Sequence, residues 1–245
     1  MKRSQRLAAI ALTLFLGLPG LASAQTQTAP ADPNVLACKT ETNPDAWIAA
    51  CDKVLAAHPK GGPGYSWAMV SRGNAYFTKG NLDHAILDYD AALKMNPKDP
   101  AAYNNRAAAH FAQGQPDLAV QDYSSALKID PKNFTAFNNR GYAYFAMRQV
   151  PEAIQDYAAA IKLNPKYFDA YNNRGVAYLA TGKYPQALTD FDTAVKISPK
   201  AADSLFMRSL CNRKLGKPRD ADRDLAMARQ IDPQIEQKMA KLGFK

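Results

Sequence analysis

The sequence predicts an all-α protein built from repeated pairs of helices. Starting at Ser66, the chain falls into five rows of 34 residues that align without a gap. Positions 20 and 27 of every row hold Ala, and position 32 always holds Pro. Small residues at fixed positions let two helices approach closely, and a regular proline ends the second of them. We therefore expect an α-solenoid in which each row forms one helix pair and stacks on the next.

The first 24 residues (1–24) predict a secretory signal peptide. They comprise the basic start MKRSQR, the apolar run LAAIALTLFLGL and a small-residue cleavage site that ends at Ala24. The run is too short to cross a bilayer as a helix. Cleavage lowers the formal net charge from +9 to +6. We expect an exported chain, periplasmic or secreted, with no integral membrane segment after processing and no nucleic-acid partner.

The remaining chain divides into a leader, two terminal helices and the five rows. Residues 25–43 are expected to form a leader or loop, because their first part, QTQTAPADPN, is polar and has no period. Because end repeats otherwise expose their core, we expect a helix at each end of the rows to cap the solenoid. The expected segments are the N-terminal helix and linker at 44–65, the rows at 66–99, 100–133, 134–167, 168–201 and 202–235, and the capping helix within 233–245.

Turn residues divide the first helix of each row from the second. Position 15 is Gly in four rows, where a left-handed conformation can end the first helix. The third row has Arg148 there, so we expect a less relaxed turn. Position 24 is aromatic in four rows and fills the space between the small residues. These aromatic residues are Tyr89, Tyr123, Tyr157 and Phe191.

This set of columns resembles the tetratricopeptide repeat (TPR) family. The resemblance covers residues 66–235 and all five rows. It implies a right-handed superhelix of helix pairs whose first helices line a concave groove. It also implies a protein or peptide partner in that groove, as an extended segment or a helix.

Charged residues of opposite sign recur in every row. Position 7, where the TPR family more often has Leu, is always Arg, and position 23 is always Asp. We expect structural ion pairs between packed helices, because a guanidinium group can bind a carboxylate through two bonds. The alternative is independent, solvated surface charges. The residues are Arg72, Asp88, Arg106, Asp122, Arg140, Asp156, Arg174, Asp190, Arg208 and Asp224.

Asparagines at positions 5 and 6 of the central rows are candidate groove residues. They are similar to a ladder in the TPR superhelix of the O-GlcNAc transferase family, which grips peptide backbones. One amide can donate to a backbone C=O and accept from an N–H. The alternative is that they serve only local structure. Position 6 is Asn105, Asn139 and Asn173, and position 5 is Asn104, Asn138 and Asn172.

An apolar column at position 12 is expected to lie beside these amides. It holds Phe77, Phe111 and Phe145. An aromatic strip suits a partly apolar segment, and the alternative is packing between neighbouring repeats. The carboxylate clamp of chaperone-binding TPR proteins is not expected, because its three cationic positions are uncharged here. The five positions hold Val70, Asn74, Asn105, Thr135 and Asn139.

Sequence signals of an enzyme are absent. The chain has no phosphate-binding loop, nucleophile elbow or zinc helix motif, and its three histidines are scattered. We expect no catalytic residue, metal site or cofactor. The predicted function is a non-enzymatic protein–protein interaction scaffold of the cell envelope. The alternative is a structural envelope protein that self-associates into a homo-oligomer and has no specific groove ligand.

The three cysteines predict one disulfide. Cys211 takes the place of an alanine column and is expected to be buried and unpaired. That leaves Cys38 and Cys51 to form a bridge in an oxidising compartment. The alternative is two free thiols.

Overall fold

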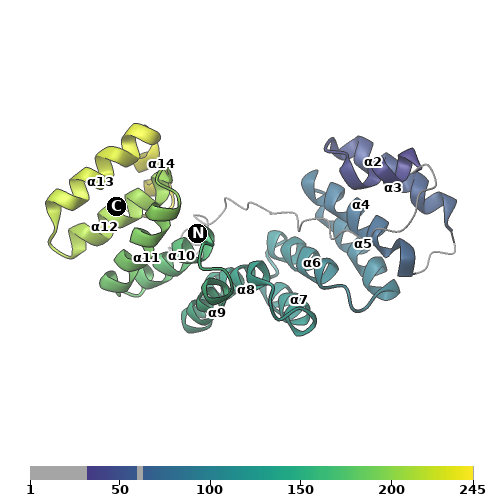
Figure 1. The fold of residues 1–245 in the computed structure, drawn as a ribbon, viewed down its shortest axis with the longest axis horizontal. Helices are drawn as coiled ribbons and strands as arrows, with labels where there is room; N and C mark the ends of the chain where they lie inside the picture. The colour runs from purple at the N-terminus through teal and green to yellow at the C-terminus, as the bar shows by residue number, and fades with distance from the viewer. Residues whose placement is uncertain (1–31, 60–62, 245) are drawn as a thin grey trace. The chain divides into compact units, whose positions relative to one another are not determined.

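The computed structural model describes residues 32–59 and 63–244, and every regular element in these ranges is a helix (Figure 1). This confirms the all-α fold class. The expected signal peptide at 1–24 and the first part of the expected leader lie outside the described residues. No helix in the described ranges combines the length and the apolar character needed to cross a membrane.

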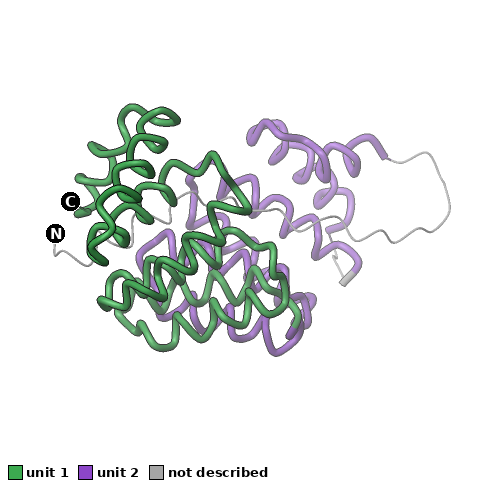
Figure 2. The backbone as a smooth tube through the Cα atoms, turned by 60° about the vertical axis from the view of Figure 1, so that its left-hand side comes forward, with its two compact units in different colours: residues 1–15, 132–245 green, residues 16–131 purple. Residues whose placement is uncertain are grey.

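The helices fall into two compact units: the first in chain order ends at Pro131 and is purple in Figure 2, and the second starts at Lys132 and is green. The first unit contains α2 (Pro33–Thr40), α3 (Pro44–Ala57), the 3-10 helix η2 (Pro63–Tyr65), α4 (Ser66–Thr78), α5 (Leu82–Met95), α6 (Pro100–Ala112) and α7 (Pro116–Ile129). The second contains α8 (Phe134–Ala146), α9 (Val150–Leu163), α10 (Phe168–Ala180), α11 (Tyr184–Ile197), α12 (Ala202–Lys214), α13 (Pro218–Ile231) and α14 (Ile235–Lys241).

Local chemistry sets the helix ends. The side chains of Asp99 and Asn133 accept hydrogen bonds from the first turns of α6 and α8, which satisfies N–H groups that have no partner within the helix. Four first helices end at a glycine with φ between 70° and 80°. In the third row Arg148 adopts φ 66° instead, a left-handed conformation that costs a side-chain-bearing residue free energy. The less relaxed turn expected there is present.

The core of each helix pair is an aromatic ring set among small residues. The alanines at positions 20 and 27 are fully buried in all five rows, and Tyr89, Tyr157 and Phe191 are at most 1% exposed. Position 8 contributes a further small residue. A Cβ added to Gly73 would lie 2.6 Å from the Tyr89 ring. Glycine there lets the aromatic ring lie directly against the first helix.

The expected leader or loop at 25–43 is wrong for its second half, because residues 33–40 form α2. The Asp32 side chain accepts from the Asn34 N–H and Pro33 takes the first helical position, which favours a helix start. The predicted disulfide is present: Cys38 is bonded to Cys51 in α3, and both are fully buried. A helix of this length is marginally stable by itself, and it is too short to show a helical period in the sequence, which is why the sequence pattern did not predict it.

At the other end, α14 packs by apolar contact. Ile235, Met239 and Phe244 are buried in one cluster with Leu205 and Met207 of α12. Cys211 is also buried in this cluster and is not bonded to another cysteine. Helix α14 therefore covers apolar residues of the last helix pair, as expected of a C-terminal capping helix.

Candidate functional site

The five arginines at position 7 each bind the aspartate sixteen residues later. In every row Nε and Nη2 of the arginine donate to the two carboxylate oxygens over 2.6–2.9 Å. The aspartates are at most 7% exposed. The bond to aspartate raises the pKa of each guanidinium group. The arginines thus join the first and second helices and stay charged.

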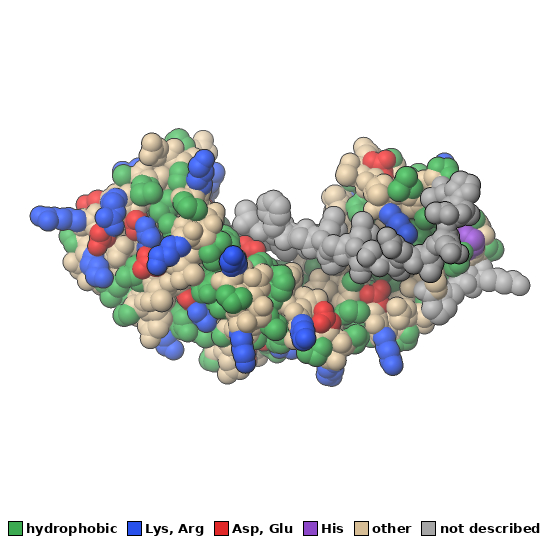
Figure 3. Space-filling view, in the orientation of Figure 1, with side chains coloured by type: hydrophobic (Ala, Val, Ile, Leu, Met, Phe, Trp, Pro, Cys, Tyr) green, Lys and Arg blue, Asp and Glu red, His purple; other side chains and the backbone are tan. Residues whose placement is uncertain are grey.

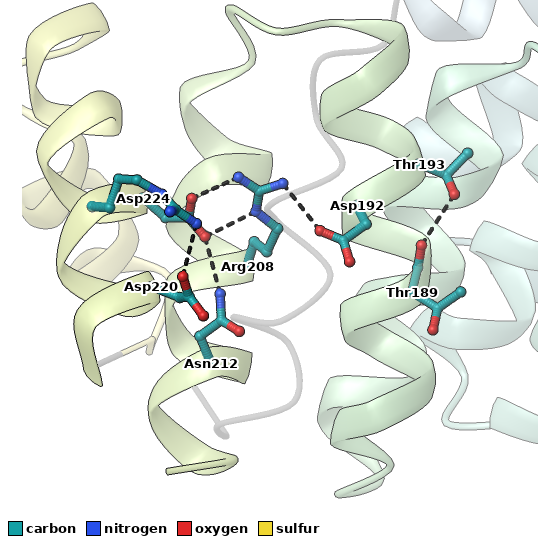
Figure 4. A network of polar contacts seen from close by, with 8 residues as sticks. Thr189, Asp192, Thr193, Arg208, Asn212, Asp220 and Asp224 are labelled. Carbon is teal, nitrogen blue, oxygen red and sulfur yellow. Dashed lines mark hydrogen bonds and ion pairs between the residues drawn. The ribbon is translucent and has the colours of Figure 1, made fainter. Parts of the chain in front are cut away.

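The last row extends this pair into a network (Figure 4). Arg208 Nη1 also donates to Asp192 of the preceding second helix at 3.0 Å. The Asn212 side chain donates to Asp224 Oδ2 at 3.1 Å, and Asp224 is fully buried. Arg208 therefore ties α11, α12 and α13 together. Its charge is compensated within the protein.

In the second unit, three candidate asparagines form a chain of side-chain amides across α8 and α10. Asn173 Nδ2 donates to Asn138 Oδ1 at 3.0 Å, and Asn138 Nδ2 donates to Asn139 Oδ1 at 3.3 Å. Asn138 is 5% exposed, whereas Asn139 and Asn173 are half-buried. Among the described residues, no partner is recorded for the Asn139 amide N–H groups or for the Asn173 side-chain oxygen. One donor group and one acceptor remain available on neighbouring first helices.

The first unit contains the same pattern with a residue that the sequence interpretation did not assign to the site. Asn105 Nδ2 donates to Asn74 Oδ1 at 2.9 Å, and the Tyr89 hydroxyl donates to the same oxygen at 2.7 Å. Within the described ranges, the Asn74 amide N–H groups and the Asn105 side-chain oxygen have no recorded partner. Asn74 stands at position 9, a column that holds asparagine in this row alone, so no repeated signal marked it.

The other two position-5 asparagines lie in packed surroundings. Asn172 Oδ1 accepts a hydrogen bond from the Ser204 hydroxyl at 2.8 Å. Asn104 Oδ1 is the one buried side-chain nitrogen or oxygen atom without a partner in the described part of the chain. Of the three position-5 asparagines, only Asn138 is buried as a whole residue, while Asn104 and Asn172 are half-buried like the asparagines at position 6.

The phenylalanines at position 12 pack between helices. Phe77 lies against the cluster formed by Ala85, Tyr89 and Ala109. Phe145 lies against buried clusters of the second unit, and Phe111 is also half-buried. These contacts agree with the alternative interpretation of the position-12 column, in which the rings pack between neighbouring repeats. Their partial exposure leaves apolar surface on the first helices.

The described residues contain no group of three His, Cys, Asp or Glu side chains that could hold a metal ion. His110 Nδ1 lies 2.9 Å from Gln115 Oε1, and its Nε2 lies 3.9 Å from Asp122 Oδ2. These contacts fit a packing residue. On the visible face, Lys and Arg side chains lie beside Asp and Glu near the C-terminal helices, so charges of both signs mix there (Figure 3).

Two family profiles match the sequence. One, described as TPR repeat, matches residues 73–114 and 109–148. The other, described as Tetratricopeptide repeat, matches residues 138–202 and 177–233. The chain belongs to the tetratricopeptide repeat family. Its Arg–Asp pairs therefore join the two helices of each TPR repeat. No curated protein sequence matches the chain.

Solved TPR structures share the fold. MamA is 25% identical, with a TM-score of 0.61, and the match covers 69% of this chain and 96% of MamA. YrrB, described as a TPR protein with an unusual peptide-binding site, is 19% identical with a TM-score of 0.63, covering 79% of this chain and 97% of YrrB. PilF of Pseudomonas aeruginosa is 22% identical with a TM-score of 0.66, covering 72% of this chain and 80% of PilF.

Proposed function

We propose that this TPR protein is a non-enzymatic scaffold that binds a peptide segment of a protein partner through its first helices. The observation that carries the proposal is the pair of unused amide groups on neighbouring first helices. In the second unit the donor is on Asn139 and the acceptor on Asn173. A peptide main chain presents an acceptor and a donor in each residue, so this pair matches its chemistry without reading side chains.

The five arginines at position 7 are already paired with aspartates, and this limits which partners the first helices can bind. All five guanidinium groups are held by buried aspartates, so their charge is already compensated. A partner rich in phosphate or carboxylate gains little from them, since anion recognition needs an available cationic group. The first helices instead carry half-buried amides and half-buried aromatic rings. It suits an uncharged or mixed segment, either extended or helical.

The cell envelope is the proposed location. The signal-peptide pattern at 1–24 supports it, and so does the disulfide between Cys38 and Cys51, because disulfides persist in oxidising compartments. YrrB, which is similar in fold, is described as having a peptide-binding site, and this supports a peptide as the class of ligand.

A display library of random twelve-residue peptides tests the proposal. Peptides selected on the mature chain are measured against a variant with Asn105→Ala, Asn139→Ala and Asn173→Ala. We expect affinity to fall roughly tenfold to a thousandfold, because each of the three lost hydrogen bonds costs about 0.5–1.5 kcal/mol. The selected peptides are also made with N-methylated backbones, which removes main-chain donors and should weaken binding similarly.

The matched control carries three polar-to-alanine changes on second helices: Gln121→Ala, Gln155→Ala and Thr189→Ala. These side chains are exposed and occupy one repeat position. We expect the control to bind selected peptides as the wild type does. Unchanged affinity of the asparagine variant, or an equal loss in the control, contradicts the proposal.

Exposed apolar residues favour self-association as the second candidate function. Large apolar side chains at position 30, near the ends of second helices, are 36–41% exposed: Ile129, Leu163, Ile197 and Ile231. Exposed apolar surface promotes association between copies. Analytical ultracentrifugation of the wild type and of a variant with Leu163→Ser and Ile197→Ser tests this function. A concentration-dependent dimer that the variant loses supports it, and a monomeric wild type excludes it.

A further inference from the structure

A segment of this chain already contacts the first row at the position where the central rows carry asparagine. Ser71 stands at position 6 of that row. Its hydroxyl donates to the backbone carbonyl of Cys38 in α2. Trp47 Nε1 donates to the same carbonyl at 2.7 Å and to Ser71 Oγ at 2.8 Å. The carbonyl, the hydroxyl and the indole N–H form a closed triangle of hydrogen bonds.

The contact is made with the main chain of α2. Cys38 lies in the last turn of this helix, where carbonyl groups have no partner within the helix. The N–H of Glu41 satisfies Ala37, and Ser71 and Trp47 satisfy Cys38. The position-6 side chain of the first row, Ser71, thus binds a backbone carbonyl of another segment. This is the chemistry that the proposed function assigns to the asparagines of later rows.

Side-chain contacts hold α2 at the same place. The Lys39 ammonium group lies 4.8 Å from the centre of the Trp67 ring, within range of a cation–π contact. Trp67 precedes Ser71 by four residues, so both lie on one face of α4. Val35 and Ala37 of α2 pack against the cluster of Trp47 and Ala68. Helix α2 is therefore held through its Cys38 carbonyl, through its apolar side chains and through Lys39 in its last turn.

We infer that α2 is an intramolecular ligand that fills the peptide-binding position of the first row. The inference rests on the proposed function, which makes position 6 a binding position. A helix of eight residues is marginal by itself. The disulfide to Cys51 keeps α2 at a high effective concentration beside Ser71. A partner segment therefore reaches position 6 of the first row only where α2 has left it.

Disulfide capture tests the inference on the full mature chain. The substitution Cys38→Pro removes the tether, disrupts α2 and leaves Cys51 as a thiol. The probe is a synthetic peptide of residues 32–41, which carries its own cysteine as a mixed disulfide with glutathione. Cys51 thiolate attacks that disulfide, joins the peptide and releases glutathione as its thiol. Intact mass measures the captured fraction. Burial raises the pKa of the Cys211 thiol to about 12, so this cysteine does not compete.

We expect the native probe to be captured several-fold more than a scrambled peptide with the same cysteine. Adding Ser71→Ala to the receptor should reduce that preference roughly fivefold, the effect of one hydrogen bond. In a second receptor, Cys38→Ser, the chain's own α2 remains able to compete, so capture should be lower than with Cys38→Pro. Circular dichroism should show that both receptors keep the helices of the repeats.

Three results overturn the inference: equal capture of native and scrambled probes, a preference that Ser71→Ala does not change, or equal capture by the two receptors. Failure of the proposed function is recognised separately. The changes Asn105→Ala, Asn139→Ala and Asn173→Ala should leave probe capture at Cys51 unaffected. If those changes also leave library-selected peptides bound, the asparagine columns are not a binding site, whatever the capture result.

Discussion

The two ends of the repeat array are covered in different ways. At the N-terminal end, α2 and α3 are joined by a disulfide, and polar groups of Trp47 and Ser71 hold a backbone carbonyl. At the C-terminal end, α14 is held by burial of Ile235 and Met239. Both ends solve the problem of an exposed terminal repeat. The first depends on an oxidised covalent bond and polar geometry, and the second on apolar area. They should therefore respond to different perturbations.

The largest expected effect lies in the C-terminal rows. Asp224→Ala leaves the buried ends of Arg208 and Asn212 without their acceptor. Removing one partner of a buried ion pair costs about 3–5 kcal/mol. The matched control is Asp192→Ala, which removes the second carboxylate of Arg208, a group whose side chain is 46% exposed, and should cost about 0–1 kcal/mol. Urea denaturation measures both. Equal costs would contradict the central place of Asp224.

Truncating the apolar cap comes next. Met239 is 1% exposed, so Met239→Ala should cost about 2–5 kcal/mol through lost burial and a cavity. Because a repeat array can unfold in parts, the loss should appear first as faster hydrogen exchange in α13 and α14. Exchange in α2 and α3 should not change. If exchange rises equally at both ends, the two caps are not independent.

Reduction of the disulfide should act on the N-terminal end alone. Cys38 and Cys51 are 13 residues apart, and a bridge closing a loop of about this size contributes about 3 kcal/mol. Opening it with dithiothreitol should speed hydrogen exchange in α2 and raise acrylamide quenching of tryptophan, because Trp47 is 9% exposed in the closed form. Unchanged quenching after complete reduction, verified by thiol titration, would show that packing alone holds α2.

The smallest expected effect concerns Ser71. With the disulfide intact, Ser71→Ala removes one hydroxyl from the triangle around the Cys38 carbonyl but leaves the Trp47 bond. The cost should be about 1 kcal/mol. The control is Thr78→Ala on the same helix, which removes a bond from a side chain to its own helix backbone. Thermal unfolding of the two variants with and without reductant separates them: the Ser71 effect should grow when the disulfide is open.

Regular features of the sequence were the ones that predicted the structure. The Arg–Asp pairs recur at constant spacing in five rows, and all five are present. By contrast, α2 occurs once, has only eight residues and owes its position to a disulfide and two donor groups from other helices. Asn138 and Asn139 are the same residue type, and only the tertiary packing shows that Asn138 is the buried one. The repeated sequence pattern therefore predicted the scaffold. Contacts that occur only once in the chain could be identified only from the structure.

The most direct test of the central claim is a nuclear magnetic resonance titration of the nitrogen-15-labelled mature chain with a library-selected peptide. The side-chain amide signals of Asn74 and Asn139 report donor groups that are unused in the peptide-free chain, and those of Gln121 and Gln155 report the second helices. The account predicts that the two asparagine signals move downfield at saturation, as expected for new hydrogen bonds to carbonyl groups, while the two glutamine signals stay in place. Movement of the glutamine signals with unmoved asparagine signals would contradict it.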